Sequence, residues 1–211
     1  MGFKSVLSIA QQWVAERLSA GDTAVDATAG GGVDTLFLCR TVGSAGKVYA
    51  FDVQERALEQ VRRRLEAQGS DGRHAAPSLL LRSHDELLEA LPAGDIGRVG
   101  AVMFNLGYLP GAETAPEQQS AAMPLVITRP ETTLPALEAA LQALKPGGIA
   151  TVVLYSGHEG GGTEAEAVQA WAEALPQERY QTVCYRFINA KAEAPYLIAV
   201  LKKPQTQSTP N

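Results

Sequence analysis

Residues 25–35 read Val25-Asp26-Ala27-Thr28-Ala29-Gly30-Gly31-Gly32-Val33-Asp34-Thr35, and this pattern is the strongest indication of the fold. It begins as an apolar run, passes through a glycine turn and continues at once into residues that favour a helix. Glycine tolerates positive φ and leaves room where the backbone must approach a ligand. A second apolar run, Val48 to Val53, carries Asp52 near its end, where a carboxylate can bind the hydroxyls of a ribose. This order predicts a site for a nucleoside cofactor.

The residue at position 35 separates two candidate cofactors. The dinucleotide fingerprint G-x-G-x-x-G requires glycine or alanine there, and this chain has Thr35. NAD is therefore the poorer candidate, and we expect S-adenosylmethionine. Its sulfonium and ammonium groups are cationic, so carboxylates beside the glycine turn would complement them.

Each polar residue near the turn has more than one interpretation. Asp26 either complements the cationic cofactor or braces the loop through its amides. Asp34 either caps the following helix or binds the amino-acid end of the cofactor. Asp52 accepts two hydroxyl donors readily. His84, in Ser83-His84-Asp85, is either an adenine contact or a helix-capping or loop histidine.

Composition indicates one well-buried α/β domain, which we place at residues 1–203 of the 211, followed by a polar tail at 204–211 that we expect to be disordered. The formal net charge of −5 gives no footprint for bulk nucleic-acid binding, although a small basic patch could still hold RNA locally. The start of the sequence does not resemble an export signal, and no long apolar run follows. We expect a cytoplasmic protein.

The cysteines do not indicate a metal site or a disulfide. Cys39 and Cys184 lie far apart in apolar contexts, and neither belongs to a CxxC pair. We expect both to be core thiols.

Strand-like and helical segments alternate along the chain. Helices are expected over about Ser5 to Ala20 and Gln54 to Gln68, and strands at Thr23–Ala27, Lys47–Val53, Ser78–Arg82, Val99–Asn105, Ile149–Tyr155, Tyr180–Ile188 and Tyr196–Lys202. Such alternation predicts a parallel sheet covered on both faces. Only a short link joins the last two strands, which suits an antiparallel pair. The predicted fold is α/β and Rossmann-like, of the class I methyltransferase type: a mostly parallel seven-stranded sheet with an antiparallel C-terminal strand.

The acceptor side of the site is predicted after the fourth and fifth strands. Asn105, in Phe104-Asn105-Leu106-Gly107-Tyr108-Leu109-Pro110-Gly111, can offer an amide and a backbone carbonyl to a substrate amine. His158, in the glycine-rich loop after Tyr155, either accepts a proton, holds RNA phosphate or braces the loop.

A long segment, two basic residues and a tryptophan in the second half of the chain also have predicted roles. The long segment from about Glu113 to Glu131 suits a lid or recognition loop and leads to a helix opening at Thr132-Thr133. Arg129 and Lys145 either add local positive charge or are simple surface residues. Trp171 falls at core spacing on a later helix.

Over nearly its whole length the chain resembles the bacterial tRNA 5-(aminomethyl)-2-thiouridine methyltransferases. The resemblance rests on these blocks: Asp26-Ala27-Thr28-Ala29-Gly30, Asp34-Thr35-Leu36-Phe37-Leu38, Tyr49-Ala50-Phe51-Asp52-Val53-Gln54, Ser83-His84-Asp85, the Phe104–Gly111 loop, Pro130-Glu131-Thr132-Thr133, Lys145-Pro146-Gly147-Gly148, Gly157-His158 and Phe187-Ile188-Asn189. Members of that family place Asn and often His where this chain has Gly31 and Val33.

The resemblance implies methyl transfer from S-adenosylmethionine to the exocyclic amine of 5-aminomethyl-(2-thio)uridine at the tRNA wobble position. The cofactor-binding residues would be Asp26, Thr28, Gly30, Gly31, Gly32, Asp34, Thr35, Asp52, Val53, Gln54, His84, Asp85 and Asn105. The catalytic residues would be Asn105, Tyr108 and His158, and the substrate-binding residues Gly107, Tyr108, Pro110, Arg129, Thr132, Tyr155 and His158. The implied partner is the anticodon stem-loop of tRNA, with no membrane, and a homodimer is one candidate assembly.

Two other functions stay open at this point. The same fold and cofactor could serve rRNA or a small-molecule amine, because the residues alone indicate only methylation of an amine or another heteroatom. A non-catalytic nucleotide-sensing or RNA-binding module is the alternative of another class, motivated by Gly31, Val33 and the acidic net charge.

Overall fold

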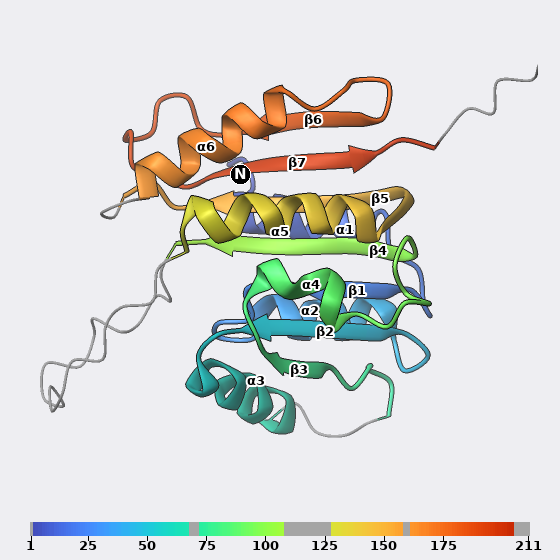
Figure 1. The fold of residues 1–211 in the computed structure, drawn as a ribbon. Coiled ribbons are helices and arrows are strands. Elements are labelled where there is room, and N and C mark those ends of the chain that lie inside the picture. Colours follow the sequence, from blue (N-terminus) through green and yellow to red (C-terminus); the bar gives the residue numbers. More distant parts are fainter. Residues whose placement is uncertain (1, 68–71, 108–127, 158–160, 205–211) are drawn as a thin grey trace, which may run out of the picture.

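The computed structural model describes residues 2–67, 72–107, 128–157 and 161–204, and these build one sheet between two layers of helices (Figure 1). The sheet has seven strands in the order β3-β2-β1-β4-β5-β7-β6. Their bounds are β1 Thr23–Asp26, β2 Lys47–Asp52, β3 Ser78–Leu81, β4 Val99–Leu106, β5 Leu144–Leu154, β6 Tyr180–Tyr185 and β7 Tyr196–Lys202.

Strand pairing confirms the predicted topology. β1 pairs in parallel with both β2 and β4, so the strand order reverses beside β1, and parallel pairs continue outward to β3 and β5. β7 runs antiparallel between β5 and β6. β6 ends at Tyr185 and not at the expected Ile188, whose side chain is 92% exposed.

The helices cover both faces of the sheet. One layer holds α1 Val6–Ala15, α2 Val33–Val42 and α3 Glu55–Ala67, and the other holds α4 Leu87–Ala90, α5 Pro130–Ala143 and α6 Gly161–Glu173, with the 3-10 turn η1 at His84–Glu86. Two expected bounds shift: α1 ends at Ala15, well before Ala20, and α5 opens at Pro130, where the fixed φ of proline suits the first helical turn.

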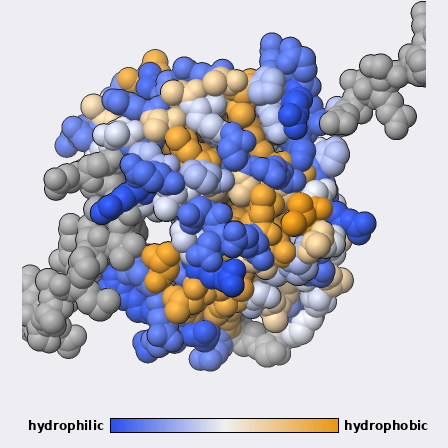
Figure 2. All heavy atoms as spheres, in the orientation of Figure 1, coloured by the Kyte–Doolittle hydropathy of each residue, from blue (hydrophilic) through white to orange (hydrophobic). Residues whose placement is uncertain are grey.

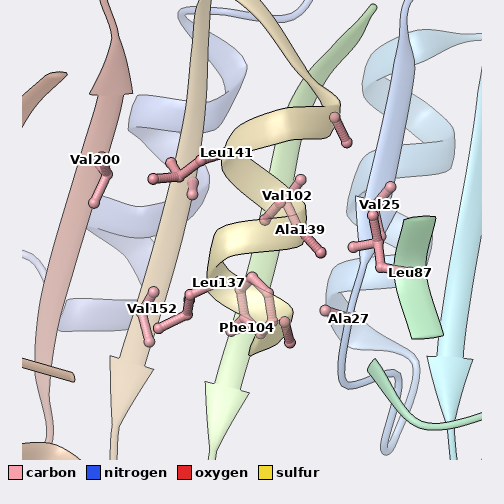
Figure 3. Packing of buried hydrophobic residues seen from close by; sticks show 14 of the residues in the cluster. Val25, Ala27, Leu87, Val102, Phe104, Leu137, Ala139, Leu141, Val152 and Val200 are labelled. Carbon is pink, nitrogen blue, oxygen red and sulfur yellow. The ribbon is translucent and has the colours of Figure 1, made fainter. Parts of the chain in front are cut away.

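The larger part of the core lies between the sheet and α4, α5 and α6. Figure 3 shows Leu137 of α5 beside Phe104 of β4 and Val152 of β5. β4 is buried along nearly its whole length, as expected for a central parallel strand covered on both faces. Removing the Phe104 side chain from water contributes about 1.5–3 kcal/mol. This packing holds the end of β4, and with it Asn105, in a fixed place.

The cysteine and tryptophan predictions are borne out only in part. Cys39 is buried, and burial raises the pKa of its thiol to about 12. The prediction for Cys184 is wrong: this residue is exposed, because β6 is an edge strand whose residues are mostly uncovered. Trp171 packs against the core but is only half-buried, and its indole N–H donates to Glu138 at 2.7 Å.

The surface over α4, α5 and α6 mixes hydrophilic residues with smaller hydrophobic patches (Figure 2). Among the helices of the described ranges, none has both the length and the hydropathy to cross a membrane.

Gly148 is predicted to tolerate no side chain. An added Cβ would lie 2.9 Å from the Lys145 carbonyl oxygen and 3.0 Å from that of Val99, where β5 passes the irregular start of β4. We expect Gly148→Ala to lower the free energy of unfolding by about 1–3 kcal/mol in urea titrations. Gly94→Ala is the matched control, because a Cβ there meets no atom within 4 Å. Equal losses in the two variants would contradict this packing.

Candidate active site

A pocket of about 460 Å³ opens at the carboxyl edge of the sheet, where β1, β2 and β4 end. Its size suits a nucleoside-sized ligand, and ligands of open α/β sheets bind at this edge, beside the reversal of strand order. The pocket is lined by Leu7, Gln11, Ala27, Thr28, Ala29, Gly30, Gly31, Val33, Asp34, Phe51, Asp52, Val53, Gln54, Arg82, Ser83, His84, Asn105, Gly107, Thr128, Arg129, Thr132 and Tyr155.

Most of the predicted site residues meet in this pocket. Of the expected cofactor-binding residues, Asp26, Gly32, Thr35 and Asp85 lie outside the lining and the others belong to it. Of the expected acceptor-side residues, Asn105, Gly107, Arg129, Thr132 and Tyr155 belong to the lining. Tyr108, Pro110 and His158 lie outside the described residues.

Asp52 holds the glycine turn against the end of β2. Its carboxylate accepts hydrogen bonds from the backbone N–H of Gly30 at 2.9 Å and of Gln54 at 2.8 Å. Burial raises the pKa of this carboxyl group, and the backbone hydrogen bonds oppose that shift. Each oxygen keeps a lone pair, so Asp52 can still accept hydroxyl donors from a ligand in the pocket.

Asp26 lies beneath the pocket floor and is fully buried. It accepts hydrogen bonds from the Thr35 hydroxyl at 2.6 Å and from the backbone N–H of Thr28 at 3.2 Å. Burial, followed by the charge of Asp34, raises the pKa of Asp26 to about 7. These contacts are those of a residue that braces the turn from below.

Asp34 links the glycine turn to the end of β4. It does not cap α2, because Gly32 is the N-cap, at φ 76°, and no side-chain capping bond forms. Instead one carboxylate oxygen accepts from Gln11 Nε2 at 2.7 Å and the other from Asn105 Nδ2 at 2.7 Å. The backbone N–H of Asn105 donates to the Thr28 hydroxyl at 2.7 Å. Asn105 is thus held through both its main chain and its side chain.

Unpartnered polar atoms mark two places in and beside the pocket. Among the described residues, Asn105 Oδ1 and His84 Nε2 are buried and have no hydrogen-bond partner, and the same holds for Asp85 Oδ1 next to His84. Burial lowers the pKa of His84 and so favours its neutral form. His84 does not cap the 3-10 turn η1. Ser83 is its N-cap and forms a capping box with Glu86. Buried polar atoms without partners in the protein commonly meet a ligand or water.

Glu164 fixes the wall of the pocket beside Asn105, a role that the sequence analysis missed. Its carboxylate is 2% exposed and accepts from the hydroxyls of Thr128 at 2.7 Å and Thr133 at 2.6 Å. The Thr128 hydroxyl in turn accepts from the backbone N–H of Gly107 at 2.9 Å. Both Gly107 and Thr128 line the pocket, so α6 positions this wall through one buried acid.

The fold and the pocket define the class of the protein. The sheet is mostly parallel, its antiparallel strand β7 lies between β5 and β6, and a nucleoside-sized pocket opens where the strand order reverses. This arrangement is that of a class I S-adenosylmethionine-dependent methyltransferase. Residues 48–201 match the model of the family described as "Putative rRNA methylase", and the chain belongs to that family.

Relatives in sequence and structure agree with this assignment. The chain is 34% identical over 207 residues to the chloroplastic tRNA (mnm(5)s(2)U34)-methyltransferase of Arabidopsis thaliana, covering 96% of this chain and 71% of that protein. A "putative rRNA-methylase" from Clostridium thermocellum superposes with a TM-score of 0.83 at 33% identity over 96% of this chain and 100% of that one. A "putative methyltransferase" from Streptococcus mutans, in complex with SAH, gives a TM-score of 0.77 at 32% identity over 95% and 99%.

Asp26 is predicted to make stability depend on pH. The folded-state pKa of about 7 exceeds the ordinary 3.8, so the native state binds the extra proton and stability falls as pH rises through this window. Asp26→Asn removes this titration, and its amide can still accept from Thr28 and donate to Thr35. We expect urea titrations from pH 4 to pH 8 to show the wild type losing stability relative to Asp26→Asn. A difference that stays constant with pH would contradict the raised pKa.

Proposed function

We propose that this enzyme methylates the exocyclic amine of 5-aminomethyl-(2-thio)uridine at the wobble position of tRNA. The observation that carries the proposal is the buried, unpartnered Oδ1 of Asn105 in a methyltransferase pocket, with the Asp34 carboxylate directly behind the same carboxamide. A hydrogen-bond acceptor backed by negative charge suits an amine that becomes cationic during the reaction. The 34% identity to the Arabidopsis tRNA methyltransferase supports the choice of substrate.

The described residues fit S-adenosylmethionine. Asp52 would hold the ribose hydroxyls, and the unpartnered Nε2 of His84, a lining residue, would face the adenine. Gly31 adjoins open space, since a Cβ there would meet no protein atom within 4 Å, and a ligand could approach its backbone closely. Thr28 and the spare lone pairs of Asp34 would serve the amino-acid end. When bound, the cofactor supplies a methyl group on a sulfonium centre that an amine can displace in line.

The chain contributes positioning and electrostatics to this transfer. Asn105 Oδ1 would accept a hydrogen bond from the neutral amine. The lone pair of the amine nitrogen would then point away from the carboxamide and into the pocket. The Asp34 charge stabilises the positive charge that develops on nitrogen. Holding the amine at one angle supplies much of the rate, because in-line displacement needs near-collinear atoms and no protein nucleophile.

The other lining residues would bind the nucleoside and its strand. Arg129 is exposed at the pocket and would meet an RNA phosphate, while Tyr155 offers an aromatic ring to the base. Gly107 and Thr132 complete this side. On the sequence alone, Tyr108, Pro110 and His158 are proposed substrate-binding residues, and Tyr108 and His158 are also proposed catalytic residues. His158 would serve either as a base or as a contact to RNA phosphate.

Methyl transfer to defined RNA tests the proposal. The purified protein would be incubated with labelled cofactor and tRNA from a strain that lacks this gene, and the nucleosides separated by mass spectrometry. We expect label in the methylaminomethyl nucleoside only, with Asn105→Ala lowering the rate at least tenfold. Label confined to rRNA or a small amine, or no label in any pool, would reject the proposed substrate.

Asp52→Ala is predicted to weaken S-adenosylmethionine binding at least tenfold by calorimetry, because it removes a charged acceptor and frees the Gly30 turn. Glu89→Ala, at an exposed acid outside the pocket, is the control and should bind as the wild type does. Unchanged affinity in a folded Asp52→Ala protein would remove the ribose assignment.

A further inference from the structure

We propose that Gln11 and Asp34 are positioning residues that lock the Asn105 carboxamide in one orientation, and that this lock directs methylation to an N–H-bearing nitrogen over a thione sulfur. The proposal rests on the proposed amine methylation and adds a reason for its selectivity. It concerns one continuous chain of side chains that runs from α1 through α2 to the end of β4.

The orientation of the carboxamide follows from the chemistry of its neighbour. An ionised carboxylate only accepts hydrogen bonds, so the Asn105 group that faces Asp34 at 2.7 Å must be the NH₂. The other Asp34 oxygen is occupied by the Gln11 NH₂, also at 2.7 Å, which fixes the carboxylate itself. Asn105 Oδ1 therefore points away from Asp34, and among the described residues it has no donor.

The elements that carry these residues hold the lock rigidly. Val6, Ala10 and Val14 bury one side of α1 against β5 and β7, and this places Gln11 at the pocket. The Asn105 backbone donates to the Thr28 hydroxyl and pairs in the sheet opposite Val153. With the main chain fixed, rotation of the carboxamide is the freedom that Gln11 and Asp34 remove.

A locked acceptor discriminates between the nucleophiles of one thiolated base. An aminomethyl nitrogen can donate an N–H to Oδ1 while its lone pair attacks. The N–C bond then forms, the C–S bond breaks with its electron pair on the cofactor sulfur, and a proton leaves the ammonium for water. A thione sulfur has no hydrogen, so its lone pairs would oppose those of Oδ1 and leave that buried acceptor unsatisfied. A carboxamide free to flip would offer NH₂ to the sulfur instead.

The test compares Gln11→Ala with Gln12→Ala on the same helix. Gln12 is exposed and its side chain bonds to Lys4 and Glu16, both on the protein surface, so its loss should not reach the pocket. With aminomethylated, thiolated tRNA and saturating S-adenosylmethionine, we expect Gln11→Ala to lower kcat about fivefold to tenfold and to raise the share of S-methylated nucleoside. Gln12→Ala should match the wild type in both.

A compensating double variant distinguishes the proposed lock from a merely structural role of Gln11. Gln11→Glu alone sets two carboxylates against each other and should lower kcat at least as far as Gln11→Ala does. In the double variant Gln11→Glu/Asp34→Asn, the carboxylate introduced on α1 can accept from the amide introduced on α2, and the oxygen of that amide can accept from Asn105 Nδ2. We expect this pair to raise kcat above that of Gln11→Glu and to restore N over S selectivity to within about twofold of the wild type. Its kcat should stay below that of the wild type, because the negative charge has moved from α2 to α1. A double variant no better than Gln11→Glu would overturn the proposal.

Side-chain amide NMR tests the lock without activity. The Asn105 NH₂ signals, assigned by their loss in Asn105→Ala, should exchange slowly in the wild type and in Gln12→Ala and rapidly in Gln11→Ala. Equal exchange in all three proteins would overturn the lock whichever RNA is methylated. If the amide is protected as expected but the wild type leaves the aminomethyl nucleoside unmethylated, the proposed function fails and the lock stands.

Discussion

The hydrogen bond between Asp34 and Asn105 ties the glycine turn after β1 to the end of β4. These are the two neighbouring strands at which the order of the sheet reverses, and the pocket lies between their carboxyl ends. The bond places a carboxylate behind the one lining amide whose oxygen is buried and unpartnered among the described residues. The residues proposed to bind the cofactor and those proposed to bind the acceptor are in this way parts of one network.

Burying acids under the pocket costs stability, and the structure offsets that cost locally. Asp26 is fully buried, yet it takes two hydrogen bonds from the turn that it supports. Asp52 and Glu164 follow the same pattern, with two donors each. Burial raises the pKa of the carboxyl groups of Asp26 and Asp52, and such shifted groups concentrate at functional sites. A cationic ligand would complete this compensation.

The sequence was sufficient for the parts of the site that depend on local pattern. The glycine turn, Asp52 at the end of its strand and the mostly parallel sheet with its antiparallel C-terminal strand follow from apolar runs and their alternation, and the structure has each of them. Gln11 and Glu164 could not be found this way, since each reaches the site only through the packing of a helix distant in sequence. Cys184 was misplaced because its apolar neighbours belong to an uncovered edge strand. The positions of Gln11, Glu164 and Cys184 depend on which distant elements pack against them, and the local sequence pattern does not encode that packing.

A crystal structure of the enzyme with S-adenosylhomocysteine would show whether the cofactor binds beside Asn105. We expect the ribose hydroxyls on the Asp52 carboxylate and the thioether sulfur facing the cavity beside Asn105, with the carboxamide oxygen turned toward that cavity. A ligand bound elsewhere, or a cavity beside Asn105 that is closed to any incoming nucleoside, would contradict this expectation.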